Sequence, residues 1–411
     1  MRHAWLVLVL VGCASRAACP AGELAAPARA PAFLLLRSDR TSSALALLDA
    51  DGAPIVTDWL DSGTRVSTLV TSLAGDPALP SSPLGTGAIA WIDRSPVDVL
   101  SVWVGDEVAQ VDLRAEAPGA RTGFSANPYD ALALTDGRVL VSRFGVNPDG
   151  SAGPLQRGND VVVVEHGAVT RSIGLGADGL IDPCTGECTA YAHPGPLVPL
   201  GPRTVLVVLD RFDRRFERAG DGGVLGIDRE TLIPSAAVSL APLQNCRAAS
   251  VDPDDPARAY VLCAGSFMLT PEGRRPSAGI AEITVDAAGS ITVAARWQAP
   301  DGVPVVGTGL IALGGGRVLA VANEGTVASA DPPDHLLEVD VVAGTVRDVY
   351  ASRGGFVLGD GALAGDVALI PDAERGGVMR VEVSGPAVAR ELIVIDDCAG
   401  LPPRQLRPLR F

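Results

Sequence analysis

The sequence contains no lysine and few aromatic residues, and both shortages limit what the protein can do. Its 33 basic side chains are all arginines, they face 48 Asp and Glu, and the formal net charge is −15. Such an acidic chain has no basic stripe to neutralise a nucleic-acid backbone, so nucleic acid is excluded as a partner. Aromatic residues make up 4% of the chain, but 47% of the residues are hydrophobic, which is too many for a disordered chain.

Long apolar runs are also missing, and the run at the start of the chain has eight residues, 4–11. This is too short to span a bilayer as a helix, whereas a positive start followed by a short apolar run is typical of a secretory signal. The residues Leu10-Val11-Gly12-Cys13 resemble the lipobox of bacterial lipoproteins. The resemblance implies removal of residues 1–12 and a lipid on Cys13, with an ordinary cleaved signal as the alternative.

The same resemblance implies an address in the bacterial cell envelope. Ala14 follows the cysteine, where an Asp would imply retention in the inner membrane, so the outer membrane is expected. Residues 13–31, rich in Ala and Pro, are interpreted as a flexible tether, and residues 32–411 as the folded domain. We expect a monomer whose contact with the membrane is the lipid anchor alone, with no prediction of leaflet or face.

Seven cysteines, 13, 19, 184, 188, 246, 263 and 398, become six if Cys13 is lipidated, an even number suited to an oxidising compartment. Cys246 and Cys263 are equally far from the turn at 252–257, so on antiparallel strands they would face each other, and we predict a disulfide between them. Cys184 and Cys188 could close a small loop, which would leave Cys19 and Cys398 to join the two ends. Six cysteines allow fifteen pairings, so the remaining connectivity stays open.

An internal repeat is the most informative feature of the chain. Residues 131–141 and 310–320 align without a gap, and each segment is a strand, a tight turn and a second strand. Further copies begin near residues 197, 248 and 362, and each copy is followed by a loop and a second hairpin. Units near 32–59, 65–113, 128–174, 194–240, 246–297, 307–351 and 360–395 predict an all-β fold, a seven-bladed β-propeller of four-stranded antiparallel blades. The competing interpretation is a pair of two-sheet sandwiches.

The first of these units shows only three strands. Propellers commonly close their ring by combining both ends of the chain in one blade, and residues 404–411 form a spare segment of suitable length. We therefore predict that Gln405 to Phe411 supply the inner strand of the first blade.

The repeat resembles the YVTN-type propellers of bacterial cell-surface proteins, among them tethered lipoproteins of unknown function. The matching residues are Asn127-Pro128-Tyr129-Asp130 leading into 139–145, and 209–217 before the strand 224–228. The Asn-Pro opening occurs in one blade, with Gln244-Asn245 as a remnant in another. The resemblance implies fold and location, and it transfers no catalytic residue.

Candidate chemistry is sparse, and no catalytic residue or metal ligand is predicted. The loop Asp252-Pro-Asp-Asp-Pro256 could offer oxygens to Ca²⁺, but it lacks the alternating ligands of a calcium loop and fits a rigid turn better. The connections at 145–159, 210–222, 265–278 and 323–334 are long, and in a propeller they share one face. In and beside them lie Arg and Phe, residue types enriched at binding hot spots. The candidate partner-binding residues are Arg143, Phe144, Arg211, Phe212, Arg215, Phe216, Phe267 and Arg274.

Two functions remain in competition. The first is a non-catalytic surface lipoprotein, a binding or scaffold module that presents this loop-bearing face to a protein or glycan of the envelope. The second is a propeller hydrolase or lactonase that holds Ca²⁺ or a cofactor in its central channel. Such an enzyme needs polar groups aimed inward from the innermost strands, and the sequences of those strands are mostly small and apolar. This favours binding, although propellers host many activities.

Overall fold

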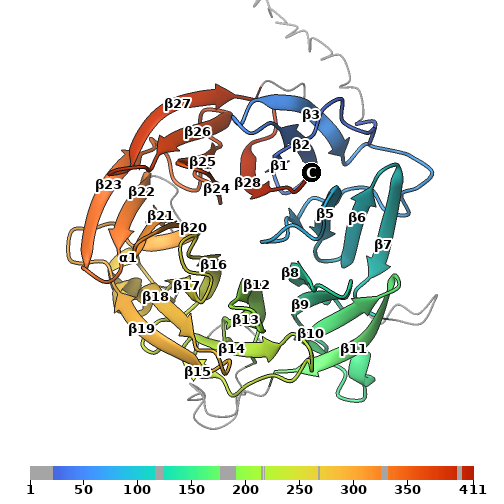
Figure 1. Ribbon diagram of the computed structural model, residues 1–411, viewed down its shortest axis with the longest axis horizontal. Coiled ribbons are helices and arrows are strands. Elements are labelled where there is room, and N and C mark those ends of the chain that lie inside the picture. Colours follow the sequence, from blue (N-terminus) through green and yellow to red (C-terminus); the bar gives the residue numbers. More distant parts are fainter. Residues whose placement is uncertain are drawn as a thin grey trace, which may run out of the picture.

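The computed structural model describes residues 22–115, 124–175, 191–213, 216, 218–266, 269–324, 332–395 and 400–411. Within these residues, seven four-stranded antiparallel sheets stand as blades around a central axis (Figure 1). The protein is a seven-bladed β-propeller, which confirms the predicted fold class and number of blades.

Each blade begins with an inner strand at the axis and ends with an outer strand at the rim. From the axis outward, blade 1 holds β28 (Pro403–Pro408), β1 (Phe33–Ser38), β2 (Ser43–Leu48) and β3 (Pro54–Asp61). Blade 2 holds β4 (Pro77–Ala78), β5 (Ala88–Asp93), β6 (Val99–Val104) and β7 (Glu107–Asp112), and blade 3 holds β8 (Pro128–Ala133), β9 (Val139–Val146), β10 (Gly158–Glu165) and β11 (Ala168–Gly174). Blade 4 holds β12 (Pro194–Leu200), β13 (Thr204–Leu209), β14 (Gly223–Asp228) and β15 (Val238–Ser239), and blade 5 holds β16 (Cys246–Val251), β17 (Arg258–Ala264), β18 (Ala278–Val285) and β19 (Ile291–Trp297). Blade 6 holds β20 (Val306–Gly314), β21 (Arg317–Asn323), β22 (Asp334–Asp340) and β23 (Thr345–Ala351), and blade 7 holds β24 (Ala362–Ala364), β25 (Val367–Asp372), β26 (Gly377–Glu382) and β27 (Val388–Val394).

The ring closes through the C-terminal segment, as predicted. β28 pairs antiparallel with β1, so that Leu406 faces Leu35, and the two ends of the chain share blade 1 (Figure 1). The side chain of Leu406 is fully buried, and its N–H donates to the carbonyl oxygen of Asp360 in front of β24. The strand therefore joins blade 7 to blade 1 and leaves no open sheet edge between them.

Burial follows the position of a strand within its blade. All six residues of β1 and of β2 are buried, because neighbouring blades cover both faces of these strands. The outermost strand β19 alternates between partly buried and exposed residues along most of its length, which is the period of a strand with one face in solvent. The aliphatic runs of blade 1 are therefore its second and third strands.

Tryptophan packs the junction between blades 1 and 2. The ring of Trp59 meets those of Trp91 and Trp103 edge to face, with ring centroids 6.2 and 5.4 Å apart, an arrangement favoured by the aromatic quadrupole. All three side chains are at most 3% exposed. These three tryptophans are thus part of the hydrophobic core.

The predicted disulfide is present. Cys246 and Cys263 face each other in the register of β16 and β17, and their sulfur atoms are bonded. Cys13, Cys19, Cys184, Cys188 and Cys398 lie outside the described residues, so their lipidation and pairing remain predictions. No helix in the described part of the chain is long and apolar enough to cross a membrane.

Candidate functional site

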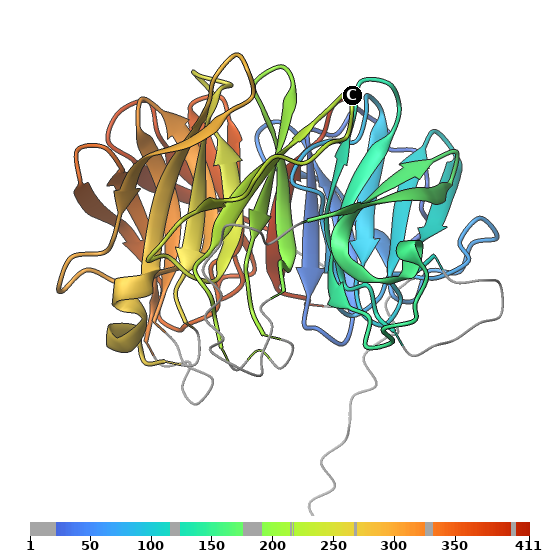
Figure 2. The ribbon, with the colours of Figure 1, turned by 90° about the horizontal axis from the view of Figure 1, so that it is seen from below.

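The two faces of the ring differ in their connections. The long loops between second and third strands, from β9 to β10, β13 to β14, β17 to β18 and β21 to β22, all leave from one face, which we call the loop face. It lies at the bottom of Figure 2, where the short helix α1 (Pro271–Arg274) projects. Two short 3₁₀ segments, at Pro154–Gln156 and Arg275–Ser277, lie in these loops as well.

Arg143, the first of the predicted binding arginines, is fully buried. Its Nε and Nη2 donate to the two carboxylate oxygens of Asp160 at 2.7 and 2.6 Å, and its Nη1 donates to the carbonyl oxygens of Leu113 and Leu155, both at 2.8 Å. The side chain links blade 3 to the end of blade 2. It has a structural role and presents no surface for the partner contact expected from the sequence.

The other predicted arginines do not form a surface patch either. Arg211 is 1% exposed, and its backbone has φ 46°, in the left-handed region. Arg274 is 8% exposed, and its Nη2 donates to the carbonyl oxygen of Asn323. Their guanidinium groups lie within the protein, so these two arginines do not present the exposed binding surface expected from the sequence. Arg215 and Phe267 lie outside the described residues.

The predicted phenylalanines do come together. The ring of Phe144 stacks on that of Phe216 with centroids 5.9 Å apart and planes 4° apart, and it stacks on Tyr129 at 6.1 Å. Phe212 lies 5.7 Å from Phe216. We call the whole group the aromatic cluster: Tyr129, Phe144, Tyr191, His193, Phe212 and Phe216. Phe212 is buried, whereas Phe216 is 39% exposed, so the cluster reaches the surface through Phe216.

His193 lies at the centre of the aromatic cluster, although the sequence did not indicate it as a site residue. Its ring lies 4.6 Å from Phe144 and 5.0 Å from Phe216, and its Nδ1 lies 2.7 Å from the carbonyl oxygen of Phe144. Burial lowers the pKa of His193, so the ring is neutral at pH 7. A carbonyl oxygen only accepts hydrogen bonds, so Nδ1 carries the proton in this contact.

The position of His193 is set by a left-handed backbone turn that recurs in three blades. Asn127, His193 and Asn245 each stand directly before an inner strand, with φ of 42°, 44° and 56°. The N–H of Asn127 donates to Asp98 Oδ1 at 2.8 Å, and that of His193 donates to Asn159 Oδ1 at 2.7 Å. An Asn tolerates this left-handed turn well, and His193 takes the same place in blade 4.

The central channel forms a cavity of about 320 Å³ on the axis of the ring. Residues of all seven inner strands or their flanks line it, and much of the wall is small and apolar, as predicted. The polar lining was missed: Ser81, Arg94, Tyr129, Arg247, Ser250, Asp360, Gln405 and Arg407. Tyr129 belongs both to this cavity and to the aromatic cluster, which therefore extends from the channel to the loop face.

Three arginines and one carboxylate face this cavity, against the acidic balance of the chain. Arg407 is paired with Asp360. Arg94 lies over the ring of Tyr129, with its Cζ 5.5 Å from the centroid. Arg247 donates from Nε and Nη2 to the neutral amide oxygen of Asn245, at 3.2 and 2.7 Å. Arg94 also lies 3.7 Å from a carboxylate oxygen of Asp76, so within the described part of the chain Arg247 is the one channel arginine with no carboxylate within 4 Å.

The carboxyl of Asp210 lies near this group and is 4% exposed. Burial raises its pKa to about 7, although the charge of Arg247 acts in the opposite direction. Burial also raises the pKa of Tyr129, so its hydroxyl stays protonated and donates to the carbonyl oxygen of Arg247 at 2.8 Å. Near neutral pH, Asp210 carries only part of a negative charge to offset Arg247.

The acidic loop considered for Ca²⁺ is a turn in the structure. Asp252 is 2% exposed; its Oδ1 accepts from the N–H of Asp254 at 2.9 Å, and its Oδ2 accepts from the hydroxyl of Tyr260 at 3.2 Å. Oδ2 also lies 3.7 Å from Arg258. Among the described residues, no group of three or more His, Cys, Asp or Glu is arranged to hold a metal ion.

The comparisons with known proteins concern the fold. Neither a family model nor a curated protein sequence matches the chain. Among solved structures, it is similar to a candidate 6-phosphogluconolactonase of Bacteroides fragilis, with a TM-score of 0.54 and 11% identity over 92% of this chain and 97% of that one. AztD of Citrobacter koseri (TM-score 0.43, 14% identity, 92% and 90% covered) and BamB of Moraxella catarrhalis (0.43, 12%, 87% and 87%) are more distant. At these identities the first likeness supports the propeller fold alone.

Proposed function

We propose that the chain is an exported, lipid-anchored binding module of the bacterial envelope, of the YVTN type, whose loop face binds a protein partner. The observation that carries this proposal is the aromatic cluster, which concentrates six rings of an aromatic-poor chain at one point and exposes Phe216. Rigid aromatic side chains at a surface give large contact area at a low cost in conformational entropy, and they are enriched at binding hot spots. A rigid base of stacked rings under Phe216 further reduces the entropy lost on binding.

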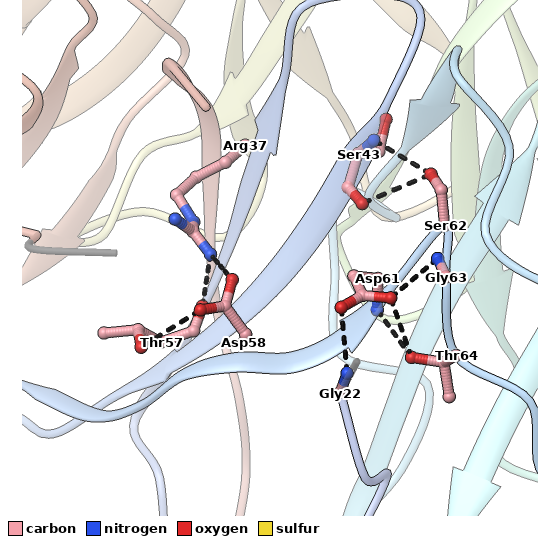
Figure 3. A network of polar contacts seen from close by, with 9 residues as sticks. All are labelled: Gly22, Arg37, Ser43, Thr57, Asp58, Asp61, Ser62, Gly63 and Thr64. Atoms are coloured by element: carbon pink, nitrogen blue, oxygen red, sulfur yellow. Dashed lines mark hydrogen bonds and ion pairs between the residues drawn. The ribbon is translucent and has the colours of Figure 1, made fainter. Parts of the chain in front are cut away.

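The course of the N-terminal segment supports an orientation of the propeller in which its loop face is directed toward the membrane. Gly22 lies at the loop-face end of β3, where its N–H donates to Asp61 Oδ2 at 2.8 Å (Figure 3). From there the segment follows β3, since Leu24 donates to the carbonyl oxygen of Trp59 and the indole of Trp59 donates to that of Ala25. Blade 1 therefore receives the chain from the loop face.

The length of the remaining tether limits the distance to the membrane. Gly22 is nine positions after Cys13, and a segment of this length reaches at most about 32 Å. With a lipid on Cys13, the loop face is directed toward the membrane, and its partner is membrane-bound or close to the membrane. Replacing Cys13 by Ala is expected to release the protein from the membrane fraction or to leave an unprocessed precursor. Mature protein that stays membrane-bound in the Cys13→Ala variant would contradict the anchor.

The partner surface is tested by two exposed apolar residues of the same blade. Phe216 lies on the loop face, whereas Ile233, 62% exposed, follows β14 and therefore lies on the opposite face. Full-length protein carrying Phe216→Ala is expected to lose at least tenfold in capture of its partner from envelope extract, because hot-spot truncations cost about 2 kcal/mol or more. Ile233→Ala is the matched control and should capture normally. Equal capture by both variants, or capture of glycan alone, would contradict a protein-binding loop face.

A further inference from the structure

We infer that the central channel is a binding site for a small organic anion, held through a carboxylate or phosphate group by Arg94 and Arg247. This site lies on the axis of the ring and does not depend on the protein partner proposed for the loop face. The cavity volume of about 320 Å³ is at the lower end of the range for small-molecule pockets, so the ligand is small.

The charges of the lining select an anion. Of the three channel arginines, Arg407 forms a close ion pair inside the cavity, with Asp360. Arg94 lies 3.7 Å from a carboxylate oxygen of Asp76, and the Asp76 side chain is 54% exposed, so solvent weakens this pair. Arg247 is oriented by the uncharged amide of Asn245. A cavity whose lining carries this excess of cations attracts negative charge.

Tyr129 contacts both arginines, through the guanidinium of Arg94 and the backbone of Arg247. Tyr129 lies under Arg94 and donates its hydroxyl hydrogen to the carbonyl oxygen of Arg247. Its ring lies beside Gly195 of blade 4, where an added Cβ would be 3.7 Å from the ring, an ordinary van der Waals distance. Tyr129 on blade 3 thus reaches the inner strand of blade 5 and supports the Arg94 cation, while Asn245 orients the Arg247 cation beside the same cavity. Preorganised cations of this kind bind a carboxylate or phosphate better than flexible ones.

The remaining wall limits the rest of the ligand. Small apolar surfaces come from Ala78, Ala248, Ala249, Ala312 and Ala362, while the hydroxyl oxygen of Ser250 already accepts from the N–H of Ala312 at 3.0 Å. A compact ligand with one anionic end and a short apolar or hydroxylated body fits this lining. Burial raises the pKa of the neighbouring Asp210 to about 7. When this carboxyl is protonated, it no longer offsets the charge of Arg247, and Arg247 then attracts an anionic ligand most strongly.

Titration calorimetry of the purified full-length protein with citrate and with inorganic phosphate tests the site. We expect saturable binding of at least one anion, no binding of glycerol, and weaker binding as salt rises. Arg94→Gln and Arg247→Gln should each weaken binding about tenfold or more, because each removes charge-assisted hydrogen bonds. The matched control is Arg203→Gln, an arginine whose side chain is 56% exposed on the other face of the ring; it should bind as the parent does. The stronger of the two probes shows whether a carboxylate or a phosphate is preferred.

A second variant separates the site from effects on folding. Ala249→Leu keeps both arginines and fills part of the cavity, so it should abolish binding while the protein still melts as a folded domain. Binding that is equal in the parent and the two Arg variants would overturn the inference, as would no binding of either anion at about 10 mM, a concentration at which even weak sites with Kd near 1 mM are filled. Loss of loop-face capture leaves these results unchanged, so the two proposals fail separately.

Discussion

The buried pair of Arg143 and Asp160 allows a sharp prediction about stability. The two side chains are 0% and 3% exposed and lie 2.6 Å apart. Replacing Arg143 by Ala removes four hydrogen bonds and leaves the carboxylate of Asp160 buried without a counter-charge. Breaking a buried ion pair in this way costs about 3–5 kcal/mol, so the variant should lose a large part of the free energy of unfolding of the whole domain.

Urea unfolding followed by circular dichroism measures this loss. The matched control is Arg390→Ala on β27, whose ion pair with Glu382 has nearly the same length, 2.7 Å, but has side chains 55% and 52% exposed. Surface pairs contribute about 0–1 kcal/mol, so the two variants should differ by about 3.5 kcal/mol, taking the midpoints of these ranges. A loss below about 1 kcal/mol for Arg143→Ala would refute the reasoning that burial, and not pair length, sets the contribution.

Three further predictions concern the ring, the disulfide and pH. Deleting residues 403–411 should expose the edge of β1 and cause aggregation, and Leu406→Ala alone should cost about 2–5 kcal/mol of unfolding free energy because the side chain is fully buried; unchanged melting of both variants would contradict ring closure. Replacing Cys246 and Cys263 by Ala should cost about 3 kcal/mol, given the separation of 17 residues, and non-reducing peptide mapping of the parent should recover the two segments linked; two free thiols would contradict the bond. Burial raises the pKa of Asp210 to about 7, above its unfolded value of about 4, so the folded state holds this proton more tightly and stability falls as the pH rises from about 4 through 7. Asp210→Asn should flatten the dependence of Tm on pH over this range, and parallel curves for variant and parent would show that Asp210 does not titrate as inferred.

The blades could be predicted from the sequence because each blade is built from local hairpins. A strand, a turn and a second strand recur with recognisable apolar runs, as in residues 131–141 and 310–320. The count of these units leaves the first one short of a strand, and Leu406 indeed occupies the missing position. The disulfide follows from the same register argument, since Cys246 and Cys263 are opposite each other. These features depend on spacing along the chain.

The roles of the arginines could not be predicted in the same way. Whether an arginine beside a loop is exposed depends on which carboxylate the fold places opposite it. The register of β9 and β10 pairs Arg143 with Asp160, because Val139 faces Val164 and Ser142 faces Val161 in the same ladder. The arginine-rich composition of the loops therefore suggests a surface, although the structure buries Arg143, Arg211 and Arg274.

The polar residues of the channel lining could not be predicted from the sequence either. Tyr129 and Arg247 stand at the beginning of inner strands, and the small residues that follow them dominate the pattern of those strands. Arg94 reaches the axis from the turn after β5, which no periodicity indicates. Gln405 and Arg407 are alternate residues of a strand predicted to be innermost, so their inward direction was available from the period of two.

Site-specific photo-crosslinking in cells tests the central claim most directly, because it asks which face of the ring meets a partner. A crosslinking amino acid is placed at position 216 on the loop face or at position 233 on the opposite face of the same blade, in the full-length protein. The proposal predicts a discrete crosslinked protein species from position 216 and none from position 233. Crosslinks from position 233 alone, or equal yields from both positions, would contradict the assignment of the loop face as the binding surface.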